Sequence, residues 1–125
     1  MAGTKNTAAR NLLADSIGDS LDSGTLKIYT TGQATLLATF NLPVAAFAAA
    51  SVGVITLSGV PISATAAAAG TAAEAVLSNS GDTIQVSGLT VGTSATDVII
   101  DNAVIASGQT VNLNAFTWTE PALTA

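Results

Sequence analysis

The side chains of this chain that could do chemistry are carboxylates, hydroxyls and very few cations. The chain contains neither histidine nor cysteine. This excludes a Ser-His-Asp triad, a Cys-His pair, disulfides, and the usual zinc, haem and iron–sulfur ligand sets. A serine–lysine pair is formally open, but Lys5 lies close to the N-terminus and Lys27 lies in an expected strand without a nearby serine motif. The residue types therefore exclude most catalytic and cofactor chemistry.

The best-spaced acidic residues are Asp97 and Asp101, with Asp82 in an expected turn. Residues four apart on a strand share a face but lie about 13 Å apart, too far for the acid–base pair of a glycosidase. Calcium could take oxygen ligands from these three or from Asn102, yet no 12-residue loop with alternating acids is present. No glycine-rich loop follows a strand and opens a helix, so nucleotide binding has no support. We expect a non-enzymatic protein without a cofactor; a structural cation site is the lesser alternative.

Charge is unusually sparse in this sequence. Three basic and eight acidic residues give a net charge of −5 and make up 9% of the chain, where a soluble domain usually has about 25%. A monomer of this mass exposes roughly 6,000 Å² of surface, which is about 550 Å² for each charged residue. Nucleic-acid binding is not expected, because it needs a basic stripe. We expect other subunits to cover much of the surface; the alternative is a secreted or heat-resistant β domain coated with Thr and Ser.

A long uncharged stretch, 28–73, raises the question of a membrane span. The hydropathy of residues 42–62 would suit a transmembrane helix. However, Pro43 and Pro61 bracket this segment, Gly53 and Gly59 interrupt it, and no Lys or Arg flanks it. The start of the chain also lacks the apolar core of a secretory signal. We therefore expect neither a membrane span nor a secretory leader.

The N-terminal residues 1–23 are predicted to form a helical arm. Ala9, Leu13 and Ile17 recur four apart, with Leu12 beside them, which predicts a narrow apolar stripe over about three turns. So short a helix does not persist alone. It must dock on its own β domain or on a neighbour, and we favour a mobile arm that becomes ordered on assembly.

The ends of this helix carry their own signals. Gly18 is the expected stop, because glycine adopts the left-handed conformation that ends helices. Asp15 and Asp19 lie near the negative end of the helix dipole, where carboxylates are unfavourable. The candidates for the N-cap are Thr4, Asn6 and Thr7.

Residues 24–125 are predicted to form a β domain. Turn signals separate short alternating stretches, which predicts a mainly β fold, a β-sandwich or jelly roll of about eight short strands. A bulge near Ala115 would reconcile the two apolar faces of the last strand. Residues 64–75 suit a helix or a loop about equally. The expected strands are 25–30, 36–42, 52–59, 72–78, 83–87, 98–101, 104–105 and 110–119, the last ended by Glu120-Pro121.

The few aromatic residues are mostly expected in the core. Phe40, Phe47, Phe116 and Trp118 are explained most simply as packing between sheets. Trp118 has a second interpretation as an anchor of a subunit contact. Tyr29, beside Lys27 on one strand face, is the better surface candidate.

Several phrases of the chain resemble small virion proteins of tailed bacteriophages. The resemblance rests on Pro43, on Ala46-Phe47 and on the segments GTLKIY (24–29), LLATF (36–40), GVITL (53–57), AGTA (69–72), SGQTV (107–111) and FTWTEPA (116–122). It implies a head decoration (cement) protein with a jelly-roll-like β fold, seated on the lattice of the major capsid protein on the virion exterior. It further implies dimers or trimers at symmetry axes that clamp neighbouring capsomers.

The expected contacts follow from this resemblance and from the apolar patterning. We expect residues 1–22 and 43–70 to carry most of the intersubunit contact. The interaction candidates are Leu12, Leu13, Ile17, Tyr29, Phe47 and Trp118. Two other functions stay open: a tail or tail-fibre component, and a small carbohydrate- or surface-binding β module, which would need exposed aromatics such as Tyr29 and Trp118.

Overall fold

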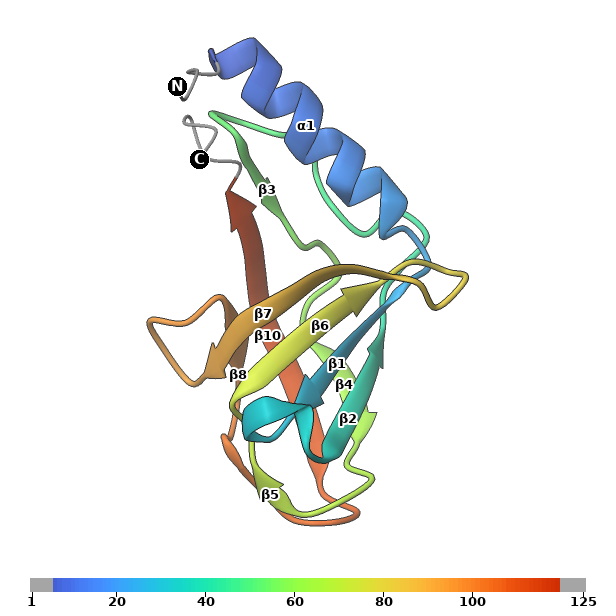
Figure 1. The fold of residues 1–125 in the computed structure, drawn as a ribbon, viewed down its shortest axis with the longest axis vertical. Helices are drawn as coiled ribbons and strands as arrows, with labels where there is room; N and C mark the ends of the chain where they lie inside the picture. Colours follow the sequence, from blue (N-terminus) through green and yellow to red (C-terminus); the bar gives the residue numbers. More distant parts are fainter. Residues whose placement is uncertain (1–5, 120–125) are drawn as a thin grey trace.

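The computed structural model describes residues 6–119. One N-terminal helix lies across the end of a strongly curled β-sheet (Figure 1). The prediction of a mainly β fold preceded by a helix is confirmed, and the curled sheet is compatible with a sandwich. The elements are α1 (Thr7–Ser20), β1 (Thr25–Tyr29), η1 (Thr31–Gln33), β2 (Leu36–Asn41), β3 (Val54–Thr56), β4 (Ile62–Thr65), β5 (Gly70–Thr71), β6 (Glu74–Ser78), β7 (Ile84–Gly92), β8 (Val98–Ile100), β9 (Val104–Ile105) and β10 (Thr110–Thr119).

The main sheet joins strands that are distant in the sequence. Its order is β2-β1-β6-β7-β8-β10-β3, with β4 paired to β10, while β5 and β9 form a separate two-stranded sheet. The pairs are antiparallel except for β7 and β8, which are parallel. Strand β6 is central, and its residues 75–78 are buried on both faces. This explains why the sequence of β6 shows only weak alternation.

Most of the expected strands are present, with three differences. β7 is longer than expected, and the expected strand 52–59 is reduced to the three residues of β3. Residues 64–75, expected to be helix or loop, are instead occupied partly by strands β4, β5 and β6. In this segment, backbone pairing with β10 and β9 overrides the helix preference of alanine.

The predicted bulge in β10 is confirmed. The register against β8 shifts between Leu113 and Ala115. As a result, Leu113 and Phe116 are both buried although they lie three residues apart. Because the bulge adds one residue to the strand, odd-numbered residues of β10 face the core before it and even-numbered residues face the core after it.

Helix α1 begins as expected but ends later. The side-chain oxygen of Asn6 accepts a hydrogen bond from the Ala9 N–H at 2.8 Å, so Asn6 is the N-cap. Of the other candidates, Thr4 lies outside the described residues, as does the expected strand end at Glu120-Pro121. The helix passes through Gly18 and is capped at Leu21. The predicted stop at Gly18 is therefore wrong: its helical backbone is buried against Ile55 and Phe47, so its lack of a side chain permits close packing.

The orientation of α1 also differs from the prediction. Ala14 and Gly18 form its buried face, while Leu12 is 68% and Leu13 40% exposed. Ile17 is half-buried and packs against the core. The helix lies on its own β domain beside β3, which is one of the two docking places expected for it (Figure 1). Leu21, just after the helix, is fully buried in the same core as the strands.

The uncharged segment 42–62 folds into loops, β3 and the start of β4. Within residues 6–119, every helix is too short or too polar to cross a bilayer.

Candidate functional site

The acidic residues considered for chemistry lie apart in the structure and have structural partners. Asp82 pairs with Lys27 at 3.0 Å, and Asp97 accepts hydrogen bonds from Thr90. Asp101 accepts the backbone and side-chain N–H groups of Asn112. No group of three or more residues with metal-ligating side chains occurs in the described part of the chain. These carboxylates thus fasten strands and loops to one another.

Polar side chains attach α1 to the segment 42–53. Asn11 Oδ1 accepts the Gly53 N–H at 2.7 Å, and Asp15 Oδ1 accepts the Ala50 N–H at 2.7 Å. Asp22, just after the helix, accepts the Ala46 N–H at 3.0 Å. This irregular segment has backbone donors that need partners, and the helix supplies them. The polar side of α1 therefore faces inward, which leaves the two leucines outside.

Exposed apolar side chains occur on α1 and on the segment 42–53 that it holds. Leu12 and Leu13 are joined by Val44, which is 80% exposed, and Val52, which is 61% exposed. We call these four residues the α1 face. They make up four of the seven large hydrophobic residues found exposed among residues 6–119. Leu12 and Leu13 are adjacent, and adjoining exposed apolar side chains are typical of a contact surface, whereas scattered ones need no explanation.

Val52 has a backbone conformation that suits its residue type poorly. Ser51 and Val54 exchange both backbone hydrogen bonds, at 2.9 and 3.0 Å, so Val52 and Gly53 form a two-residue hairpin turn. Both have positive φ, 51° and 75°, as a type I′ turn requires. A β-branched residue is strained in this region, where Asn is preferred. Strain of this kind tends to be retained where the side chain has a function.

Replacing Val52 by asparagine is expected to raise the free energy of unfolding by about 1 kcal/mol, because it removes this strain at the preferred Asn-Gly turn. Urea unfolding followed by Trp118 fluorescence measures the change. Val52→Thr is the matched control: it keeps the branched side chain and should bring no gain. Equal stability of all three proteins would contradict the assignment of strain.

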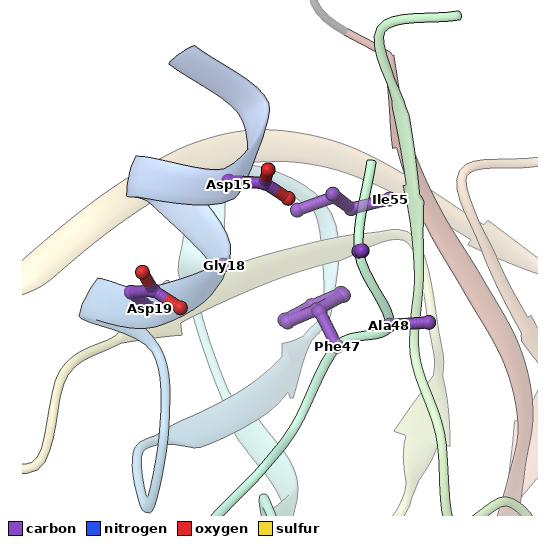
Figure 2. Close-up of a pocket in the computed structure, with 7 residues that line it drawn as sticks. Asp15, Gly18, Asp19, Phe47, Ala48 and Ile55 are labelled. Atoms are coloured by element: carbon purple, nitrogen blue, oxygen red, sulfur yellow. The ribbon is translucent and has the colours of Figure 1, made fainter. Parts of the chain in front are cut away.

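A pocket of about 330 Å³ lies between α1 and β3. One wall is helical, with the carboxylates of Asp15 and Asp19, and the other holds Phe47 and Ile55 (Figure 2). Gly18 lies between the two carboxylates on the helix, where an added Cβ would come within 3.3 Å of Ile55 and Phe47. The remaining lining residues are Ala48 and Ala49. The pocket therefore combines an apolar side with an acidic side.

Asp19 differs from the other acidic residues. Of the seven acidic side chains among residues 6–119, it alone makes neither a hydrogen bond nor an ion pair. It lies in the last turn of α1, which contains no basic residue. Asp19 is exposed, and its carboxylate lies beside the negative end of the helix dipole without a protein partner among residues 6–119.

The predicted interaction residues occupy different environments in the structure. Phe47 is half-buried, and its ring meets that of Phe116 edge to face, with centroids 5.9 Å apart. Trp118 is also half-buried, pairs in register with Ile55 and packs against the core. Both lie near α1, as do Ile17 and the two leucines. Tyr29 does not, because it ends β1 on the side away from the helix (Figure 1).

Val44, Val52 and Asp19 are not among the interaction candidates predicted from the sequence. Val44 and Val52 were counted as parts of an apolar segment and a strand. Gly53, in the middle of the expected strand, was the available sign of a turn. Asp19 carried a clearer sign, namely its unfavourable place near the end of a helix.

Comparisons of the chain with protein-family models, with curated proteins and with solved structures found no match.

Proposed function

We propose that this chain is a non-enzymatic structural protein of a tailed-phage virion, a head decoration protein that binds the outside of the major capsid lattice. In this proposal the α1 face meets the lattice or a neighbouring copy. A protein that binds the assembled lattice but not its dissociated parts stabilises the lattice by mass action. Its homo-oligomers would clamp neighbouring capsomers.

The observation that carries the proposal is the α1 face itself. The chain has an accessible surface of 6158 Å² but only eleven charged residues. Sparse charge does little to keep molecules apart. On that surface, four of the seven exposed large apolar side chains among residues 6–119 belong to one helix and its attached segment. Contacts through such a face bury apolar area without the desolvation of ion pairs.

The test replaces leucines of the α1 face by aspartate. The double variant Leu12→Asp/Leu13→Asp is expected to bind virion shells grown without this gene at least about tenfold more weakly, since charged groups are depleted from interface cores. Its fold should persist, because both side chains point away from the core. Co-sedimentation with the shells measures binding, and circular dichroism measures folding.

The matched control is Ile84→Asp/Val104→Asp, which adds the same charge at side chains 58% and 67% exposed, outside the α1 face. It should bind like the unchanged chain. Equal binding by all three proteins, or equal loss in both variants, would contradict the proposal. Phe47→Asp is a poorer test, because it would also disturb the packing against Phe116.

Copy number separates the head from the tail. A decoration protein is present in hundreds of copies per particle, whereas a tail or tail-fibre component is present in a handful. Densitometry of a gel of purified virions therefore checks the placement. A handful of copies would move the protein to the tail.

A further inference from the structure

We propose that the pocket between α1 and β3 receives an arginine side chain of a partner protein. Its guanidinium group would lie between the carboxylates of Asp15 and Asp19, and its methylene stem would lie against the half-buried Phe47. This deepens the proposed function, because it names the chemistry that the docking surface takes from its partner. Only the identity of the partner rests on that proposal.

The lining of the pocket carries the first step of the argument. The pocket has a volume of about 330 Å³ and is lined by Asp15 and Asp19 on the helix and by Phe47 opposite, with Ile55 fully buried behind them (Figure 2). A long cationic side chain matches both walls, since its stem is apolar and its head is charged. A metal ion fits less well, because no third carboxylate or other metal-ligating group joins the two within the described residues.

Uncompensated charge carries the second step. Asp15 uses Oδ1 for the Ala50 N–H, and Asp19 has no polar partner among residues 6–119. Both carboxylates lie in the C-terminal half of a helix whose last turn holds no basic residue. Asp15 is half-buried and Asp19 is exposed, so the negative potential of the pocket lining extends to the solvent, where it can attract a cation. A cation from outside would satisfy it.

The aromatic wall favours arginine over lysine. Phe47 presents its ring to the pocket opposite the helical carboxylates (Figure 2). A guanidinium group stacks on an aromatic ring and donates two parallel hydrogen bonds to a carboxylate, whereas an ammonium group is a compact and strongly hydrated charge. The partner of this pocket is therefore an exposed arginine on the protein to which the chain docks.

The test uses the purified chain and N-acetyl-argininamide, with N-acetyl-citrullinamide as the neutral probe of the same shape. Amide NMR shifts of Gly18, Asp19, Phe47 and Ile55 should change and saturate with the arginine probe, with a dissociation constant in the millimolar range, because one side chain supplies few contacts. The citrulline probe should leave them unchanged. A lysine probe should bind more weakly than the arginine probe.

Asp19→Asn is expected to weaken arginine binding about fivefold, as loss of one partly exposed ion pair. The same variant should raise the melting temperature by about 1–4 °C, because it removes a carboxylate from the negative end of the helix. If Asp19 had only a structural role, Asp19→Asn would not weaken arginine binding while raising the melting temperature. Asp82→Asn, which makes the same charge change at the far ion pair with Lys27, should leave arginine binding unchanged.

The outcomes separate this inference from the proposed function. Failure of the arginine probe to shift these amides, or equal binding of arginine and citrulline, would overturn the pocket assignment whatever the virion assays show. Equal binding of lysine and arginine would overturn the assignment to arginine. Probe binding as expected, together with normal shell binding by Leu12→Asp/Leu13→Asp, would retain the pocket and reject docking through the α1 face.

Discussion

Gly24→Ala is expected to lower the free energy of unfolding by about 3 kcal/mol or more. Gly24 follows α1 at the point where the chain enters β1, beside the end of β6. A Cβ atom there would overlap the carbonyl oxygen of Ser78 and come within 2.9 Å of the carbonyl oxygen of Leu21. Both obstacles are backbone atoms, so no side-chain rotation relieves the overlap. The α1–β1 connection would have to move away from the sheet.

Two hydrogen bonds would be affected by that movement. The Gly24 N–H donates to the Leu21 carbonyl at 2.8 Å, and the Gly24 carbonyl accepts from the Leu42 N–H at 2.9 Å. Urea unfolding followed by the fluorescence of the single tryptophan, Trp118, measures the loss. Gly81→Ala is the matched control, because an added Cβ there meets only the Asn79 side chain at 3.4 Å. A comparable cost at both glycines would contradict the steric explanation.

Phe116→Ala is expected to cost about 3–5 kcal/mol of folding free energy, the range for large aromatic truncations in a core. Phe116 is 1% exposed and belongs to the principal core cluster. Its ring also supports Phe47, which contacts α1 at Gly18. Since small domains have only about 5–15 kcal/mol of stability, this one change would remove a large part of it.

Phe116→Leu is the conservative control and should cost much less, because it leaves a smaller cavity. Phe47→Ala should also cost less than Phe116→Ala, since Phe47 is only half-buried. Chemical unfolding of the three variants under one set of conditions checks this order. A loss at Phe47 larger than the loss at Phe116 would show that the loop against α1, rather than the sheet, limits stability.

The arrangement of α1 connects these stability predictions to docking. The helix is held by Asn11, Asp15 and the close approach at Gly18, so two of its large apolar residues are not needed in the core. Leu12 and Leu13 thereby stay available for a partner. Loss of Phe116 would loosen the wall that Phe47 forms, and with it the pocket that we assign to arginine.

Much of the sheet could be predicted from the sequence, because strand alternation is a local property. β1, with Leu26 and Ile28 buried, follows the expected pattern, and β10 has its expected bounds and bulge. The hairpin loop at 79–82 is also confirmed, since Asn79 Oδ1 accepts the N–H groups of Gly81 and Thr83. In these segments the residue types of a few consecutive positions are sufficient to determine the backbone conformation.

The predictions that are wrong concern residues whose burial depends on contacts with residues distant in the sequence. The apolar stripe of α1 predicted burial of Leu13, but hydrogen bonds to the N–H groups of residues 50 and 53 turn the half-buried Asn11 and Asp15 inward instead. Gly18 was assigned to a helix end because its partners, Phe47 and Ile55, are about thirty residues away or more. Helix periodicity alone carries no information about such partners.

By itself, the sequence determined the class of the fold, the position of the helix and most strands, and the scarcity of charge. These properties depend on composition and on periodicity over a few residues. Only the tertiary structure decided which side of α1 faces the solvent, which carboxylate stays without a partner, and where an apolar wall meets an acidic one. The reason is that burial in an irregular segment is settled by the backbone groups that must find hydrogen bonds there, and those groups are brought together only by folding.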